Sequence, residues 1–187
     1  MNGQTEFVYY YPNRVGRIIF QAMQEVIGHN ELNAVLNLAN LHHLINNYPP
    51  NNSDLSLKFC ELGSAQSVLE GLYGQQGGRG LAMRMGRVSF TYGLREFGPE
   101  LGLTDIAFRM LPLDLKIQTA ANKFVEIVNN LSDQRVCFEE KTDRYLWHIE
   151  RCPFCWQRTT GNPVCHLPVG SLQEALYWVS GRKIFQC

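Results

Sequence analysis

Residues 152–181 read CPFCWQRTTGNPVCHLPVGSLQEALYWVSG, and this stretch is the most informative part of the chain. Cys152 and Cys155 are separated by two residues, and Cys165 follows after nine more. A two-residue gap lets two sulfurs turn toward one zinc ion about 2.3 Å away, and a second pair of ligands completes the tetrahedron. The second pair is imperfect here. The candidate metal ligands are Cys165, Cys155, Cys152 and Cys187.

Two other roles for these thiols remain open. They could be ordinary small residues buried without a ligand, or a redox pair. The redox role is the weaker one, because no strand-to-helix unit of the thioredoxin kind surrounds Cys152 and Cys155. Cys165 directly precedes an expected helix, whose free backbone N–H groups favour a thiolate.

The segments on both sides of this loop predict a helix and a hairpin. Pro168 suits the first turn of a helix that apolar spacing extends to residue 181. Upstream, apolar residues alternate over 136–150 with a Thr-Asp turn, which predicts two antiparallel strands. Residues 183–187 read as a final extended segment.

The rest of the chain is mainly helical in pattern. Asn13 can cap the first helix, and the Asn- and Pro-rich stretch 46–53 is the clearest loop. Apolar residues recur at helical spacing in segments 13–27, 30–38, 55–73, 81–97, 104–110 and 113–131. This order predicts a single α+β domain in which helices cover an antiparallel sheet.

Composition excludes several classes of partner. Lys plus Arg and Asp plus Glu both number 17, so no excess positive charge attracts nucleic acid. The apolar runs are too short to span a membrane, and no basic leader precedes one, so we expect a cytoplasmic protein. No dinucleotide fingerprint, nucleophile elbow or metalloprotease motif is found, so we expect no nucleotide cofactor and favour binding over catalysis.

Aromatic residues are dense on the helices and strands expected to face each other. Such residues form an ordinary core or, where incompletely packed, a ligand pocket, and sequence does not separate the two. The candidate pocket residues are Phe90, Tyr92, Phe97, Phe108, Phe124 and Trp147.

The glycine-rich run GQQGGRG at 74–80 allows two interpretations. Backbone amides at a helix start can bind phosphate, but the Lys-Ser/Thr ending and the preceding strand of a P-loop are absent. We favour glycines that allow a tight crossing between two helices.

Three segments together resemble the 4-vinyl reductase (hydrocarbon-binding) domain family. They are YGQQGGRGLAMRMGR at 73–87 with FTYGL at 90–94, CPFC at 152–155 with PVCH at 163–166, and GSLQEAL at 170–176. The resemblance covers most of the chain from about residue 55. It implies a core at 55–187 preceded by a helical extension at 1–54.

The resemblance implies the fold of TRAPP-complex subunits and haem nitric-oxide sensors, a twisted antiparallel sheet packed by helices around an apolar pocket, commonly in a homodimer. In members with zinc, the Cys matching Cys165 is one ligand, and a Glu-x-x-Cys tail after the last strand supplies others. This sequence stops at Cys187, about where that tail should begin. We therefore expect either a truncated chain, or a site that is lost or rebuilt with Cys152, Cys155, His166 or Cys187 as substitute ligands.

Three functions follow as expectations. The first is non-catalytic binding of a small hydrophobic ligand by a sensor, carrier or regulatory module, with any zinc in a structural role. The second is an accessory role in vinyl reduction of a (bacterio)chlorophyll precursor, which would need a hydride donor from another protein. The third is a dimerisation or assembly module without a ligand.

Overall fold

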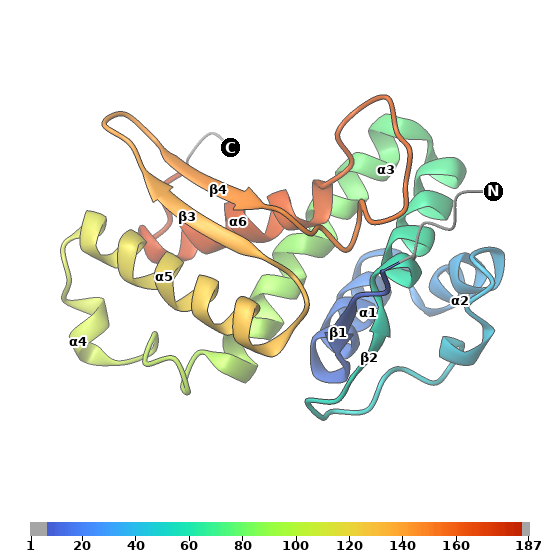
Figure 1. Cartoon of the computed structure of the whole chain (residues 1–187), viewed down its shortest axis with the longest axis horizontal. Helices are drawn as coiled ribbons and strands as arrows, with labels where there is room; N and C mark the ends of the chain where they lie inside the picture. The colour runs from blue at the N-terminus through green and yellow to red at the C-terminus, as the bar shows by residue number, and fades with distance from the viewer. Residues whose placement is uncertain (1–6, 185–187) are drawn as a thin grey trace.

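The computed structural model describes residues 7–184 and has an α+β architecture dominated by helices (Figure 1). Its elements in chain order are β1 (Tyr10–Pro12), α1 (Asn13–Ile27), α2 (His29–Leu38), the 3-10 helix η1 (His42–Leu44), β2 (Leu55–Lys58), α3 (Phe59–Phe97), α4 (Ile106–Arg109), α5 (Leu113–Leu131), β3 (Val136–Glu140), β4 (Tyr145–Ile149) and α6 (His166–Val179). The expected bounds of α1 and α5 are confirmed.

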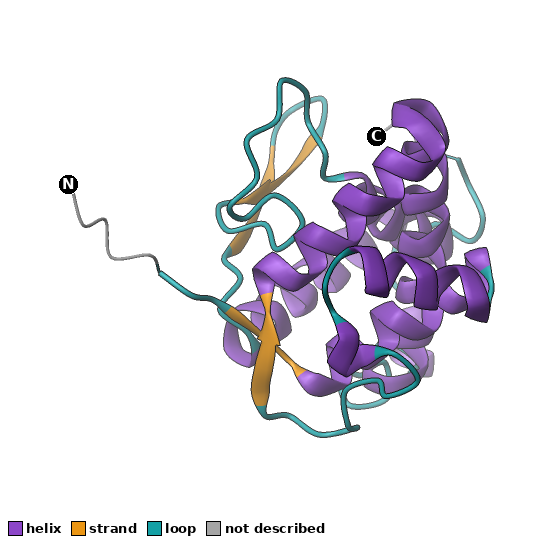
Figure 2. Cartoon of the chain, turned by 90° about the vertical axis from the view of Figure 1, so that its right-hand side faces the viewer, coloured by secondary structure: helices purple, strands orange, loops and turns teal. Residues whose placement is uncertain are grey.

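In the part of the chain that the structure describes, the strands form two separate antiparallel pairs, and not the single twisted sheet that the family resemblance implies (Figure 2). β3 and β4 make the expected hairpin, with Val136 opposite Ile149 and Glu140 opposite Tyr145. β1 pairs with β2, which sequence reading assigned to the start of a helix. With only three and four residues, these two strands lack the length to show a clear period-two pattern.

The β1–β2 pair ties the N-terminal segment to the rest of the molecule. Tyr10 pairs with Lys58, and α1 packs extensively along α3. The sequence predicted that Asn13 caps α1. In the structure Asn13 lies within the first turn of α1, and its side chain does not cap the helix. Its amide instead donates to Asn52 Oδ1 at 2.8 Å, so this residue fixes the loop before β2.

α3 contains two helical segments joined at a kink. The expected break at 74–80 is confined to Gly74, whose φ of 71° and ψ of 168° favour glycine. Residues 75–80 are helical, so their amides do not form the open loop that a phosphate site would need. Past the kink, a Cβ at Gly78 would lie 2.8 Å from Glu70 Cα, so glycine permits this close contact.

α3 also crosses α6 at backbone contact distance. A side chain on Gly86 would overlap the Leu167 carbonyl, and one on Gly170 would overlap the Met83 carbonyl. The Ser171 hydroxyl donates to the Gly86 carbonyl oxygen at 2.9 Å across the crossing. This contact holds α6 in one position against α3.

The buried residues form two clusters. The larger one joins α1, α2, the first part of α3 and the loop after β4, and includes Phe20, Leu36 and Phe59. The smaller one joins α4, α5 and the end of α6, and includes Phe108 and Ile117. No helix within residues 7–184 combines the length and the apolar character needed to cross a bilayer.

Candidate functional site: an apolar cavity beside a cysteine cluster

A cavity of about 250 Å³, partly open to solvent, lies where the two clusters meet. α1, α3, α5, the hairpin and the start of α6 all contribute to its wall. Among residues 7–184 no charged side chain lines it, and most of the wall is aliphatic or aromatic. The apolar lining residues include Val15, Ile18, Ile19, Leu94, Ile127, Val128, Leu131, Ile149, Phe154, Leu167 and Leu172.

Four of the six aromatic residues proposed for a pocket line this cavity. They are Phe90, Phe97, Phe124 and Trp147. Phe90 and Phe124 are in edge contact, with ring centroids 5.7 Å apart. These side chains from α3, α5 and β4 give the cavity an aromatic side.

Tyr92 and Phe108, the other two residues proposed for the pocket, do not line this cavity. Tyr92 lies two helical positions after Phe90 and therefore faces away, and its hydroxyl donates to the Glu25 carboxylate. That hydrogen bond raises the pKa of Tyr92. Phe108 stacks on Trp178, with centroids 5.8 Å apart, inside the smaller cluster.

Sequence reading missed the aliphatic wall from α1. Val15, Ile18 and Ile19 form part of an evident amphipathic face, but the pattern does not reveal which helix that face meets. The position of α1 depends on the β1–β2 pairing, which the sequence signalled only weakly.

A few polar groups interrupt the apolar wall. The Tyr11 hydroxyl donates to Gln134, and burial, followed by the nearby Cys152, raises the pKa of Tyr11. Ser132 donates to the Val128 carbonyl at 2.7 Å. Ser89 Oγ is buried and has no hydrogen-bond partner among the described residues.

Cys152, Cys155 and Cys165 come together at the side of the cavity. Their sulfur atoms all lie within 4.8 Å of one another, and the Cys165 sulfur is 2.7 Å from that of Cys155 and 3.4 Å from that of Cys152. The backbone amides of Cys155 and Trp156 both donate to the Cys152 carbonyl, which turns the first two thiols toward Cys165. Cys165 immediately precedes α6, as expected.

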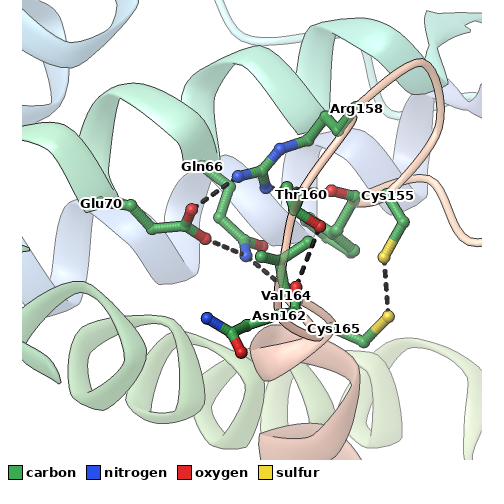
Figure 3. A network of polar contacts seen from close by, with 9 residues as sticks. Gln66, Glu70, Cys155, Arg158, Thr160, Asn162, Val164 and Cys165 are labelled. Atoms are coloured by element: carbon green, nitrogen blue, oxygen red, sulfur yellow. Dashed lines mark hydrogen bonds and ion pairs between the residues drawn. The ribbon is translucent and has the colours of Figure 1, made fainter. Parts of the chain in front are cut away.

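The loop that carries these cysteines is fastened to α3 by buried polar contacts (Figure 3). Arg158 forms an ion pair with Glu70 at 2.5 Å and donates to the Phe154 carbonyl at 3.1 Å. Gln66 donates both to Glu70 at 2.8 Å and to the Val164 carbonyl at 2.5 Å. Both ends of the loop are therefore held by one turn of α3.

The three thiols have distinct acidities. Hydrogen bonds with Cys152 and then Cys155 lower the pKa of Cys165 to about 3, and His166 and Arg158 add to this lowering. Hydrogen bonds to Cys155 and Cys165, together with burial, raise the pKa of Cys152. Cys165 is therefore the thiol of the cluster that most readily forms a thiolate, the form that binds a cation.

The three cysteines could hold a metal ion. Sulfurs at about 2.3 Å from a tetrahedral zinc lie about 3.8 Å apart, so the observed group needs to open by about 1 Å or less. His166, considered as a substitute ligand, is not part of the group of close donor atoms. Cys187 lies outside the described residues.

The cysteine loop also forms part of the cavity wall. Phe154 and Leu167 both line the cavity. In sequence, Phe154 lies between Cys152 and Cys155, and Leu167 is two residues after Cys165. The position of this wall therefore depends on the arrangement of the thiols.

Comparison of the chain with protein-family models, with curated proteins and with solved structures gives no match.

Proposed function

We propose that this protein binds a small hydrophobic molecule without transforming it, as a sensor, carrier or regulatory module. The observation that carries the proposal is the cavity of about 250 Å³ with an uncharged, mainly apolar wall. Apolar cavities of this kind favour apolar ligands because a ligand removes its own surface and that of the wall from water.

The polar groups at the cavity favour binding over catalysis. They are hydroxyls and amides, which orient a ligand but are poor acids and bases near neutral pH. His42, His43 and His148 are exposed and do not line the cavity. This arrangement also supports ligand binding more than a direct part in vinyl reduction.

The proposal extends to a hydrocarbon-binding domain with a structural zinc. The helices around an apolar cavity and Cys165 at the start of α6 support that assignment. A zinc ion held by Cys152, Cys155 and Cys165 would fix the wall formed by Phe154 and Leu167. Because such thiolates persist in a reducing compartment, we place the protein in the cytoplasm.

Exposed apolar side chains support a homodimer as a second element of the proposal. Ile106 and Met110 are 76% and 80% exposed, and Leu115 nearby in sequence is 48% exposed. Neighbouring exposed apolar residues often mark a protein contact. Sedimentation analysis of the protein and of an Ile106→Asp/Met110→Asp variant tests this; equal masses for both contradict it.

A cavity-filling substitution tests ligand binding. Gly93 lines the cavity, and a Cβ built there has no neighbour within 4 Å. We expect calorimetric titration with naphthalene to show binding to the wild type and at least a tenfold weaker affinity for Gly93→Leu, because the leucine occupies the ligand's space.

Gly80→Leu is the matched control, because Gly80 is also in α3 with open space around it but does not line the cavity. This variant should bind naphthalene like the wild type. Absence of naphthalene binding to the wild type, or equal binding to Gly93→Leu, contradicts the proposed function.

A further inference from the structure

Cys155 and Cys165 bring their sulfur atoms to within 2.7 Å of each other from the two ends of one loop (Figure 3). The sulfurs of Cys152 and Cys165 are farther apart, at 3.4 Å. A disulfide needs a sulfur separation of about 2.05 Å, so the nearer pair has to close by about 0.7 Å. This pair differs from the two-residue pair of Cys152 and Cys155 that the sequence singles out.

The same two cysteines are the more exposed members of the cluster. Cys155 and Cys165 are half-buried, whereas Cys152 has 7% of its surface exposed. A small oxidant reaches a partly exposed thiol more readily than a buried one. Exposure and proximity therefore select the same pair.

Thiol–disulfide exchange gives a balanced route to a bond between them. One thiolate of the pair attacks a low-molecular-weight disulfide such as glutathione disulfide, forms a mixed disulfide and releases one glutathione thiolate. The second thiolate attacks the protein sulfur of the mixed disulfide, forms the Cys155–Cys165 bond and releases the other glutathione thiolate. Two electrons pass from the protein to the small disulfide, and the two glutathione thiolates take up the two protons that the cysteines lose. Excess reduced glutathione reverses the reaction.

The disulfide and a bound zinc ion require different positions of the same sulfurs. Two sulfurs on one tetrahedral zinc lie about 3.8 Å apart, and those of a disulfide about 2.05 Å. The separation therefore differs by about 1.7 Å between the two states. The states also exclude each other, because the disulfide uses two of the three clustered thiols.

The Cys165 side of the loop is fixed to α3. A Cβ on Gly86 would overlap the Leu167 carbonyl, so the first turn of α6 is in backbone contact with α3. The Val164 carbonyl accepts a hydrogen bond from Gln66, also in α3. A change in the sulfur separation is therefore taken up mainly on the Cys155 side.

That side of the loop carries part of the cavity wall. Phe154, next to Cys155, lines the cavity and has 4% of its surface exposed. Its carbonyl is held at 3.1 Å by Arg158, whose long side chain can follow a shift of the turn. The state of the thiols therefore affects the space next to the Phe154 ring.

We propose that Cys155 and Cys165 form a reversible disulfide that regulates ligand binding in the cavity. The reduced, zinc-bound state and the disulfide state hold Phe154 in different positions. The inference rests on the proposed function, because its output is the affinity of the cavity for its ligand.

Oxidation with glutathione disulfide, followed by peptide mapping, tests the bond. The chain has six cysteines, so we expect six free thiols to fall to four, with a cross-link between Cys155 and Cys165. Excess reduced glutathione should restore all six. Cys152→Ser should still form the cross-link. A bond between Cys152 and Cys155, a bond to Cys187 or a lasting glutathione adduct in its place overturns the proposal.

Calorimetric titration with naphthalene tests the regulation. The reduced protein with one equivalent of zinc is compared with the oxidised protein, and we expect their dissociation constants to differ by about fivefold or more. Cys137→Ser should behave like the wild type, because Cys137 lies outside the cluster. The double variant Cys155→Ser/Cys165→Ser should bind naphthalene equally before and after treatment with glutathione disulfide.

The outcomes separate the switch from the proposed function. Equal dissociation constants for the two states of the wild type, with naphthalene bound in both, refute the switch and leave the proposed function standing. If naphthalene binds neither state, both fail.

Discussion

The Arg158 guanidinium lies 2.5 Å from the Glu70 carboxylate and joins the cysteine loop to the middle of α3. Both side chains are largely buried, with 11% and 17% of their surfaces exposed. Gln66 shares the same carboxylate and also holds the Val164 carbonyl, next to Cys165. The geometry of the thiols therefore depends on an acid in a distant part of the sequence.

Glu70→Gln should weaken both the fold and the thiol site. It leaves Arg158 buried without its counter-charge, which we expect to lower the free energy of unfolding by about 2 kcal/mol. The contacts of Glu70 also position the loop that carries the thiols. Their loss should therefore lower the affinity for zinc by about tenfold. Urea unfolding and competition with a chromogenic chelator measure the two effects.

Glu126→Gln provides the comparison, because Glu126 pairs with Lys123 at 3.7 Å on the surface. An exposed pair of this kind contributes about 0.5 kcal/mol or less. Equal losses of stability in the two variants would contradict a special role for Glu70.

Gly170→Ala should separate α6 from α3. The added methyl group would overlap the backbone carbonyl of Met83, which cannot move without shifting the helix. Overpacking of this kind costs about 3 kcal/mol, measured by thermal or urea unfolding. Gly80→Ala, with open space around the new Cβ, should instead stabilise the protein by about 0.5–1 kcal/mol. A neutral Gly170→Ala would refute the close crossing.

Removal of one cluster thiol should abolish stoichiometric zinc binding. We expect about one zinc per chain in the wild type, measured by elemental analysis after dialysis, and little in Cys165→Ser, because Cys165 contacts both other sulfurs. Chelation should also lower the melting temperature of the wild type. Cys137→Ser is the control, since Cys137 is exposed on β3 and lies outside the cluster. Equal zinc contents of Cys165→Ser and Cys137→Ser would exclude the cluster as the binding site.

Local patterns predicted the elements that depend on local sequence. α5 and the β3–β4 hairpin follow directly from hydrophobic spacing and a Thr-Asp turn. The favoured role of the glycine-rich run, a close approach of two helical segments, agrees with the contact of Gly78 with Glu70. The extent of the break was wrong, because only Gly74 has positive φ and residues 75–80 continue the helix. A pattern of glycines does not specify which one adopts that conformation.

The cysteine site could be predicted because spacing in the chain corresponds there to proximity in space. Cys152, Cys155 and Cys165 lie in one loop, and the sequence grouped them correctly. Glu70 had no distinguishing neighbour in sequence, because its role arises from its contact with Arg158 in the cysteine loop. Tertiary contacts of this kind carry no local periodic signal.

Tyr11 should make stability dependent on pH in the alkaline range. Burial raises the pKa of this phenol in the folded state, whereas in the unfolded chain it titrates near its ordinary value of 10. The unfolded state therefore releases the proton first. The stabilisation is complete below pH 10 and declines as the pH rises above it, by about 1 kcal/mol between pH 10 and 11.

Tyr11→Phe lacks this titration but retains that of the lysines. The difference in unfolding free energy between wild type and variant, measured in urea from pH 8 to 11, should thus stay constant to about pH 10 and then shrink. A difference that stays constant to pH 11 would mean that Tyr11 titrates alike in both states and is not enclosed with Gln134 at the cavity wall.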